Sequence, residues 1–192
     1  MNKHNDEQSD IATLGLWIYL MTDMMLFAGL FATFMVLRGN TAGGPAAADI
    51  FNMPYILIET LVLLFSSLMC GLAFVSAKFG RLRDMRIYLG LTILFGAVFI
   101  GMELYEFSQL VGEGHSWSVS AFLSSYFTLV GTHGLHIAVG LLWASVLFVR
   151  LLKRPLNPNS LRKLGLFALF WHFLELVWIF IFSIVYLIGG TI

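Results

Sequence analysis

Cysteine, proline and charged residues are all scarce in this chain of 192 residues. Because Cys70 is the only cysteine, a disulfide within the chain is impossible and a metal site built from several thiolates is excluded. Only 11% of the residues are charged whereas 59% are hydrophobic, which excludes a soluble globular domain. A cleaved signal peptide is not expected, because residues 1–13 are mixed and polar and the apolar run after them is too long.

Long apolar runs make up most of the chain. They cover roughly residues 14–37, 55–77, 87–111, 121–149 and 164–188. Each run meets or exceeds the ~20 residues that a helix needs to cross a bilayer, and open strands cannot satisfy their backbone in lipid. The sequence therefore predicts an all-α integral membrane protein with a cytoplasmic tail over 1–13 and a single bundle of five transmembrane helices over 14–190.

Positive charge lies almost entirely in the N-terminal tail and in the second and fourth connections between the runs. The residues are Lys3, Lys78, Arg81, Arg83, Arg86, Arg150, Lys153, Arg154, Arg162 and Lys163. Arg38, in the first connection, is the one basic residue elsewhere. With five crossings the tail and those two connections share one side of the membrane, and an excess of Lys and Arg marks the cytoplasmic side. We therefore predict a cytoplasmic N-terminus and a periplasmic C-terminus.

The run ends carry residues typical of turns and of membrane interfaces. The first connection, 38–54, is punctuated by Gly and Pro, and Pro155 and Pro158 end a helix in the fourth. Aromatic residues near run ends are interpreted as anchors at headgroup depth; these are Trp17, Tyr19, Tyr55, Tyr105, Trp117, Tyr126 and Tyr186.

Ionisable side chains occur inside the apolar runs, where a charge costs about 2.5–3.5 kcal/mol near the midplane on insertion scales. They are Asp23, Glu59, Glu103, Glu106, His133, His136, His172 and Glu175. They must face protein, trapped water or one another, and we expect the carboxyls to stay protonated or to share protons with the histidines. A rise of ~1.5 Å per residue separates an inner, cytoplasmic tier from an outer tier. The inner tier is Asp23, His172, Glu175 and His136, and the outer tier is Glu59, Glu103, Glu106 and His133.

Polar residues three positions apart share a helix face, and we expect three such stripes to converge inside the bundle. The pairs are Glu103/Glu106, His133/His136 and His172/Glu175. Di-iron bundles use similar residues but carry Glu-x-x-His, which is missing here, so we expect no metal ligand in this chain. Proton transport is a second interpretation, although no helix is clearly interrupted at midplane depth as transporter ion sites require. The favoured interpretation is structural: the groups bond across helices or line a groove that faces lipid or another subunit.

Three segments resemble the signature segments of subunit III of haem–copper terminal oxidases. They are Gly131–His136 (GTHGLH), Phe170–Trp178 (FWHFLELVW) and Gly101–Glu106 (GMELYE). The resemblance extends from about Leu14 to Gly190 and looks like the five-helix form of a family whose longer members have seven helices.

Within that family, three further segments look closest to the cytochrome bo-type ubiquinol oxidases. They are Gly15–Met21 (GLWIYLM), Thr41–Pro45 (TAGGP) and Glu59–Ser67 (ETLVLLFSS). Helix number does not separate quinol from cytochrome c as the electron donor, because some cytochrome c oxidases share the short form.

The resemblance implies an accessory, non-redox role with no catalytic residue in this chain. Subunit III carries no haem or copper, which belong to subunit I; it packs beside subunit I, holds phospholipid, and supports sustained proton uptake and the integrity of the catalytic centre. The implied partners are oxidase subunits I, II and IV and membrane lipids in a bacterial inner membrane, with no nucleic acid. A stand-alone proton-coupled transporter and a cytochrome c oxidase subunit III are the alternatives.

Four positions carry over individually from the resemblance. Asp23 matches the position of a buried Glu that longer members pair with a helix histidine, and His136 matches that histidine. Glu59 matches an Asn of some longer members. Arg150 matches an arginine that binds a lipid headgroup, and simple snorkelling to the interface is the alternative interpretation.

Overall fold

The computed structural model describes residues 3–41, 52–153 and 157–188, and all regular secondary structure among them is helical. The elements are α1 (Lys3–Leu37), α3 (Met53–Lys78), α4 (Leu82–Gly112), α5 (Ala121–Lys153), α6 (Pro158–Ile181) and the π-helix η1 (Phe182–Ile188). Among the described residues, five helices are long and apolar enough to cross a membrane, and α6 with η1 forms the last of them. The prediction of an all-α protein with five membrane-spanning helices is confirmed.

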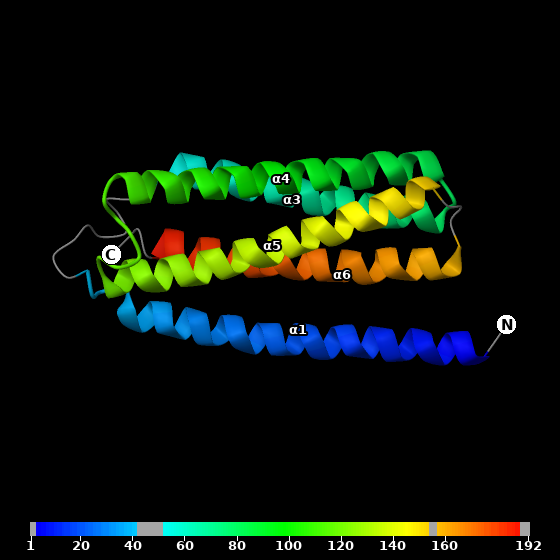
Figure 1. Ribbon diagram of the computed structural model, residues 1–192, viewed down its shortest axis with the longest axis horizontal. Helices are drawn as coiled ribbons and strands as arrows, with labels where there is room; N and C mark the ends of the chain where they lie inside the picture. The colour runs from blue at the N-terminus through cyan, green and yellow to red at the C-terminus, as the bar shows by residue number, and fades with distance from the viewer. Residues whose placement is uncertain (1–2, 42–51, 154–156, 189–192) are drawn as a thin grey trace.

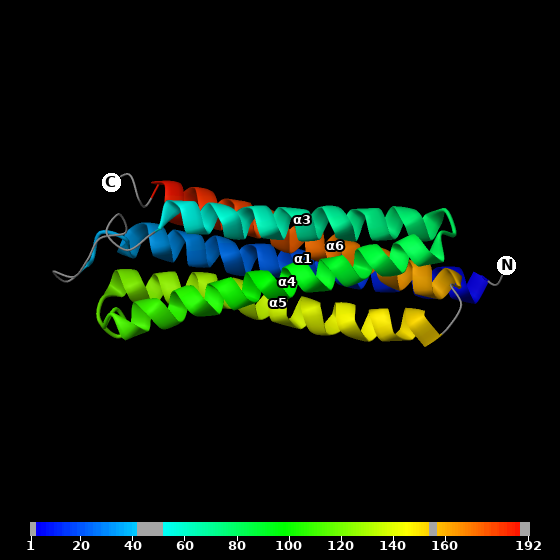
Figure 2. The ribbon, with the colours of Figure 1, turned by 90° about the horizontal axis from the view of Figure 1, so that it is seen from above.

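The helices form two layers, with α1 along one edge of the bundle (Figures 1 and 2). One layer contains α4 and α5 and the other contains α3 and α6; α3 packs on α4 over a long interface. The tight turn between α3 and α4 passes through Gly80, whose φ of 72° favours glycine. α1 packs against α5 and α6, the two helices most distant from it in the sequence.

The basic connections lie at the same end of the bundle as the start of α1, and Arg38 follows α1 at the opposite end (Figure 1). At the basic end α6 begins at Pro158, and Asn157 caps it by accepting a hydrogen bond from the Ser160 N–H at 2.7 Å. The structure therefore gathers the positive charge at one end, as the positive-inside pattern requires. Which side of the membrane this end faces stays a prediction.

Some sequence features fall outside the described residues. They include the Gly/Pro-rich part of the first connection, at 42–51, and Arg154 and Pro155 in the fourth. α1 begins at Lys3, well before the apolar run that starts near residue 14, so the polar N-terminal segment and the first span form one continuous helix.

Tyr126 and Tyr186 are not interface anchors, and the prediction for these two residues is wrong. Both side chains are 0% exposed, and their hydroxyls lie 3.1 Å apart between α5 and η1. Trp117 and Tyr105 are exposed near the ends of their segments, where an anchor is expected. Position along the helix shows which residues lie near a helix end, but it did not distinguish the lipid-facing side from the interior.

Trp171 of α6 is the largest side chain at the junction of α4, α5 and α6. Its buried indole ring fits between two glycines, Gly96 on α4 and Gly140 on α5. A Cβ atom at Gly140 would lie 2.9 Å from Trp171 Cζ3, and one at Gly96 would lie 3.0 Å from Trp171 Cη2. Because lipid provides no hydrophobic drive for helix association, this close packing is what holds the three helices together.

We predict that Gly140→Ala destabilises the protein by about 1–3 kcal/mol, because the added methyl group overpacks against a rigid indole. The measurement is thermal unfolding in one fixed detergent or lipid mixture. Gly101→Ala is the matched control, since a Cβ atom at Gly101 meets nothing within 4 Å. Equal stability of the two variants would show that Trp171 is not confined as described.

Candidate functional site

Asp23 on α1 and His136 on α5 form an ion-pair contact across the edge of the bundle. Asp23 Oδ2 lies 3.3 Å from His136 Nε2, and the two side chains are 9% and 15% exposed. His136 Nδ1 lies 2.7 Å from the Thr132 carbonyl oxygen, which can only accept, so Nδ1 carries a hydrogen. Asp23 Oδ2 makes no hydrogen bond among the described residues, so the link between α1 and α5 is this ion-pair contact.

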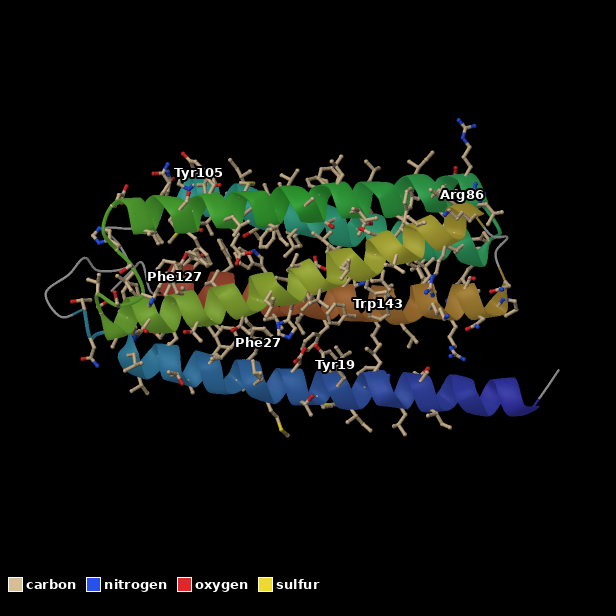
Figure 3. All side chains as sticks on the ribbon, in the orientation of Figure 1. Tyr19, Phe27, Arg86, Tyr105, Phe127 and Trp143 are labelled. Atoms are coloured by element: carbon tan, nitrogen blue, oxygen red, sulfur yellow. The ribbon has the colours of Figure 1, made fainter. Side chains whose placement is uncertain are left out.

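Aromatic rings enclose this pair. The Phe27 ring lies 5.4 Å from the His136 ring and 6.3 Å from the His133 ring, measured between centroids. Tyr19, one turn before Asp23, lies 6.3 Å from the Phe170 ring of α6. Both Tyr19 and Phe27 extend from α1 toward the α5/α6 side (Figure 3). These rings are the main packing around the pair on the inner side of α1.

A second group, the outer carboxyl cluster, consists of Glu59, Glu103, Glu106, Tyr126 and Tyr186 from α3, α4, α5 and η1. The Tyr126 hydroxyl donates to Glu106 Oε1 at 3.2 Å and also lies 3.1 Å from the Tyr186 hydroxyl. Within the cluster the carboxyls interact electrostatically with one another. Glu59 and Glu103 are buried and Glu106 is partly buried. Four elements thus meet at one polar centre near the end of the bundle opposite the basic connections.

Several atoms at and near this cluster have no hydrogen-bond partner among the described residues. They are both carboxyl oxygens of Glu59, Glu103 Oε1, Glu106 Oε2 and both ring nitrogens of His133. A buried carboxylate without a donor is very unfavourable, whereas protonated carboxyls can donate to one another. The arrangement therefore favours neutral acids that share protons within the cluster.

His133 lies beside the outer carboxyl cluster in an aromatic cage. Its fully buried ring stacks on Trp178 at 5.3 Å, with an interplanar angle of 28°, and Phe99 contacts both rings edge-on. The Trp178 indole N–H donates to Thr60 Oγ1 at 3.1 Å. A Cβ atom on the neighbouring Gly134 would lie 2.5 Å from Glu103 Oε1, so glycine is what lets the carboxyl reach α5.

The third polar group lies between α3 and α6, away from the other two. The Ser67 hydroxyl donates to Glu175 Oε2, and His172 Nδ1 lies 2.6 Å from the Ala168 carbonyl oxygen. His172 is exposed, in contrast to the prediction that it is buried, because it lies on a side of α6 that the described helices leave uncovered. The three stripes do not all converge: Glu103 reaches α5 beside Gly134, whereas the α6 stripe turns toward α3 and His136 faces α1.

Sequence reasoning missed Tyr126, Tyr186, Ser67 and Thr60 as partners of the ionisable groups. The hydroxyl groups of serine and threonine are common in membrane helices, so no spacing identified Ser67 or Thr60. The tyrosines did carry a signal, since both occupy the same outer depth as the carboxyls.

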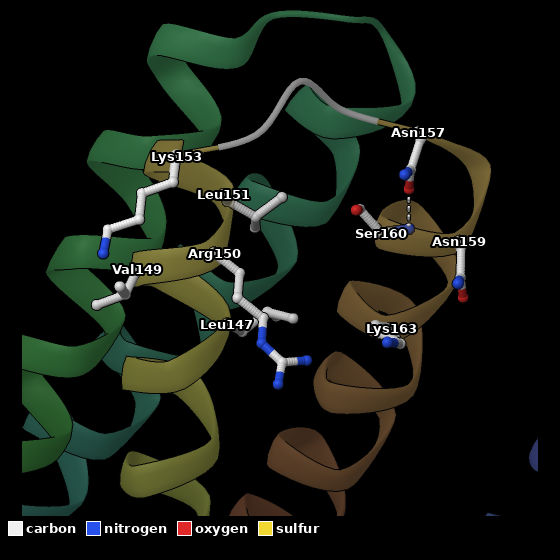
Figure 4. Close-up of a pocket in the computed structure, with 9 residues that line it drawn as sticks. All are labelled: Leu147, Val149, Arg150, Leu151, Lys153, Asn157, Asn159, Ser160 and Lys163. Carbon is white, nitrogen blue, oxygen red and sulfur yellow. Dashed lines mark hydrogen bonds between the residues drawn. The ribbon is translucent and has the colours of Figure 1, made fainter.

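Arg150 lines a surface pocket of about 560 Å³ between the end of α5 and the start of α6. The polar residues of its wall are Arg150, Lys153, Lys163, Asn157, Asn159 and Ser160. Figure 4 shows the Arg150 guanidinium extending toward α6, whereas the Lys153 side chain points to the other side of α5. The wall contains three cations and no acidic residue, which suits an anionic group.

Among the described residues, no group of three or more His, Cys, Asp or Glu side chains is arranged to hold a metal ion. Asp23 and His136 are paired with each other, and the outer carboxyl cluster contains acids and phenols without a histidine that bonds them.

Known proteins resemble this chain over nearly its whole length. A sequence model of the family described as "Cytochrome c oxidase subunit III" matches residues 1–190. The chain is 50% identical over 187 residues to "Cytochrome bo(3) ubiquinol oxidase subunit 3" of Pseudomonas aeruginosa, covering 97% of this chain and 90% of that protein. The protein of the same name from Pseudomonas putida is 45% identical over 183 residues, covering 95% and 88%. "Cytochrome c oxidase subunit 3" of Bacillus sp. (strain PS3) is 46% identical over 176 residues, covering 92% and 85%.

We predict that Asp23 and His136 are energetically coupled in a double-mutant cycle of Asp23→Leu, His136→Leu and the double variant. The coupling energy should be about 0.6 kcal/mol and at most about 1.7 kcal/mol, the range for interhelical hydrogen bonds in membranes. Unfolding free energies in a fixed detergent supply the measurement. A parallel cycle of Thr22→Leu with His136→Leu is the control and should be additive, because Thr22 is exposed and bonds its own helix. Additivity of the Asp23 cycle would contradict the pairing.

Proposed function

Because the chain belongs to the cytochrome c oxidase subunit III family, we propose that it is the accessory subunit III of a proton-pumping haem–copper quinol oxidase in a bacterial inner membrane. The observation that carries the quinol assignment is the 50% identity to the ubiquinol oxidase subunit of Pseudomonas aeruginosa, against 46% to the cytochrome c oxidase subunit of Bacillus sp. (strain PS3). A cytochrome c oxidase subunit III is the second candidate, supported by the relative from Bacillus sp.. An assay of the purified complex with ubiquinol and with reduced cytochrome c separates the two.

The proposed role is structural support for the subunit that reacts with dioxygen. In the complex, haems and copper held by subunit I would oxidise ubiquinol and reduce dioxygen to water. The proposal assigns no redox step to this chain. Its partners would be subunits I, II and IV and membrane lipid, with the N-terminus cytoplasmic and the C-terminus periplasmic.

The Asp23–His136 pair supports this role through the attachment of α1. α1 is the edge helix, and among the described residues its main contacts are with α5 and α6. The contact between Asp23 and His136 restrains the rotation of α1 about its axis, because it joins one side of α1 to one side of α5. We propose that the pair keeps α1 in place while the complex turns over, and that it takes no part in the chemistry.

The Arg150 pocket supports the lipid-binding part of the proposal. It lies at the basic end of the bundle, where the headgroups of the cytoplasmic leaflet would be found. A phosphate group between Arg150 and Lys163 would meet cations from both α5 and α6. The two helices would then be bridged by the lipid at the point where the connection between them begins.

A stand-alone proton-coupled transporter is the rival from another class. The polar contacts form three sets on different helices: the Asp23–His136 pair, the outer carboxyl cluster and the Ser67–Glu175 bond. Reconstitution of the isolated chain in liposomes distinguishes the two functions, since only a transporter would dissipate or use a proton gradient by itself.

We predict that an oxidase containing Asp23→Leu starts at a nearly normal rate of oxygen consumption but inactivates sooner during turnover or loses this subunit. The physical reason is that α1 loses its polar attachment while the reaction centre in subunit I is unchanged. Initial rate, decay rate and subunit content are measured on the same preparation, with Thr22→Leu as the control. Immediate loss of turnover in an intact complex would contradict the accessory role, as would stoichiometric iron or copper in the chain purified alone.

We also predict that Arg150→Gln reduces the anionic phospholipid that copurifies with the complex. The substitution removes one of three cations from the pocket, which is worth about 1 kcal/mol per charge near an anionic surface, or roughly a fivefold loss of affinity. Mass spectrometry of extracted lipid is the measurement. Arg83→Gln is the control, because Arg83 is exposed at the same end but does not line the pocket. Equal lipid content in both variants would show that Arg150 does not bind lipid specifically and only extends its charged end to the membrane interface.

A further inference from the structure

Arg86 of α4 bonds the end of α5, although the two residues that the bond joins are 65 positions apart in the sequence. Arg86 Nη2 donates to the Leu151 carbonyl oxygen at 3.0 Å. Figure 3 labels Arg86 at the basic end of the bundle, where α4 begins and α5 ends. The side chain is half-buried, and its Nε is buried without a hydrogen-bond partner among the described residues. The guanidinium therefore lies against the helices and does not extend freely into the headgroups.

The Leu151 carbonyl needs a donor from outside α5. An α-helical carbonyl accepts from the N–H four residues later, which for Leu151 is position 155. That position is Pro155, and proline has no N–H, so the sequence itself leaves this carbonyl without its helical partner. α5 ends at Lys153, and the carbonyls at a helix end carry partial negative charge.

The guanidinium of Arg86 meets both requirements of this helix end, because it supplies an N–H donor and a positive charge. Among the residues that the structure describes, no acidic side chain forms an ion pair with Arg86. The carbonyl end of α5 is therefore the negative group that this cation meets. Arg86 caps α5 from a neighbouring helix, a role that the spacing of basic residues in the sequence does not reveal.

The end of α5 that Arg86 holds is also one wall of the Arg150 pocket. The part of this wall that belongs to α5 is formed by Leu147, Val149, Arg150, Leu151 and Lys153. Figure 4 shows Arg150 and Leu151 on neighbouring positions of α5, with the Arg150 guanidinium extending toward α6. Arg86 does not line the pocket, but its bond acts one residue away from the cation that does.

We propose that Arg86 is a positioning residue of the Arg150 pocket: its bond to Leu151 holds the last turn of α5, and this turn orients the Arg150 guanidinium toward the phosphate of an anionic phospholipid. The inference rests on the proposed function, since it takes the pocket as a lipid site. Without the bond the Leu151 carbonyl lacks a donor and the last turn frays. Ordering Arg150 on lipid binding then costs additional conformational entropy, so the affinity for lipid falls.

A purely electrostatic role of Arg86 would give a different pattern. Any cation at this end of the bundle adds to the attraction for anionic lipid. Arg83 is the matched control, because it is exposed on the preceding turn of α4, carries the same charge and does not line the pocket. Arg83→Met and Arg86→Met remove the same charge, whereas only Arg86→Met removes the bond to α5.

The test titrates phosphatidylglycerol into the assembled, detergent-washed oxidase and counts bound lipid by native mass spectrometry. Arg86→Met should weaken binding roughly two- to fivefold, with an upper limit set by the loss expected for Arg150→Gln, through which it acts. Arg83→Met should change binding little, because salt screens an exposed charge. Arg86→Lys keeps the charge and an N–H donor and should restore most of the loss. Equal losses in the two methionine variants would overturn the positioning role.

Non-additivity provides a second test. If Arg86 acts through Arg150, then Arg86→Met should cause little further loss of lipid in a chain that already carries Arg150→Gln, since no guanidinium remains to be oriented. Additive losses would show that Arg86 contributes independently and would overturn the proposal.

Hydrogen exchange in the last turn of α5 reports the bond itself. Arg86→Met should speed exchange of these amides with or without Arg150→Gln, whereas Arg83→Met should not. Unchanged exchange in Arg86→Met would also overturn the proposal, because the end of α5 would then be held without Arg86.

Failure of the proposed lipid role gives a separate result. In that case Arg150→Gln binds phosphatidylglycerol as tightly as the wild type, and the inference falls with it, even where exchange at the end of α5 responds to Arg86→Met. If Arg150→Gln weakens lipid binding and Arg86→Met does not, the positioning role alone is wrong and the lipid pocket stands.

Discussion

Every polar group in a lipid-embedded helix has to find its partner in protein, because the hydrocarbon around it offers none. This constraint organises the whole bundle. It joins α1 to α5 through Asp23 and His136, gathers four elements around the outer carboxyl cluster, and turns Glu175 of α6 toward Ser67 of α3. The apolar side chains are interchangeable to a much greater degree, since they meet carbon atoms whether they face lipid or another helix. The few polar residues therefore specify which helix lies beside which.

Close packing then supplies the stability that the polar contacts, at about 0.6 kcal/mol each, cannot. Trp171 illustrates how the two effects cooperate. Its indole fits between glycines of α4 and α5, and the same α6 segment places Trp178 against His133 and Thr60. One helix thus provides both the largest packing element and an indole donor for a hydroxyl of α3. The π-helical turn that follows carries Tyr186 to Tyr126 and closes the outer end of the bundle.

The sequence predicted the features that depend on length, composition and depth. Five spans, their all-helical nature and the gathering of basic residues at one end of the bundle follow from run length and the positions of Lys and Arg. Rotation about each helix axis could not be predicted, because both the lipid-facing and the buried sides of these helices are apolar. That is why Tyr126 was mistaken for an anchor and His172 for a buried residue. The partners of the carboxyls were missed for the same reason: depth identifies candidates, but only the packing selects among them.

The placement of α1 has a consequence for how the protein is made. α1 is the first helix to leave the ribosome, yet the surfaces that receive it belong to α5 and α6, which are synthesised last. α1 is therefore inserted before its packing partners, and Asp23 enters the bilayer without the imidazole of His136. Asp23 gains this contact only once α5 is inserted, and the surface that receives α1 is complete only after α6.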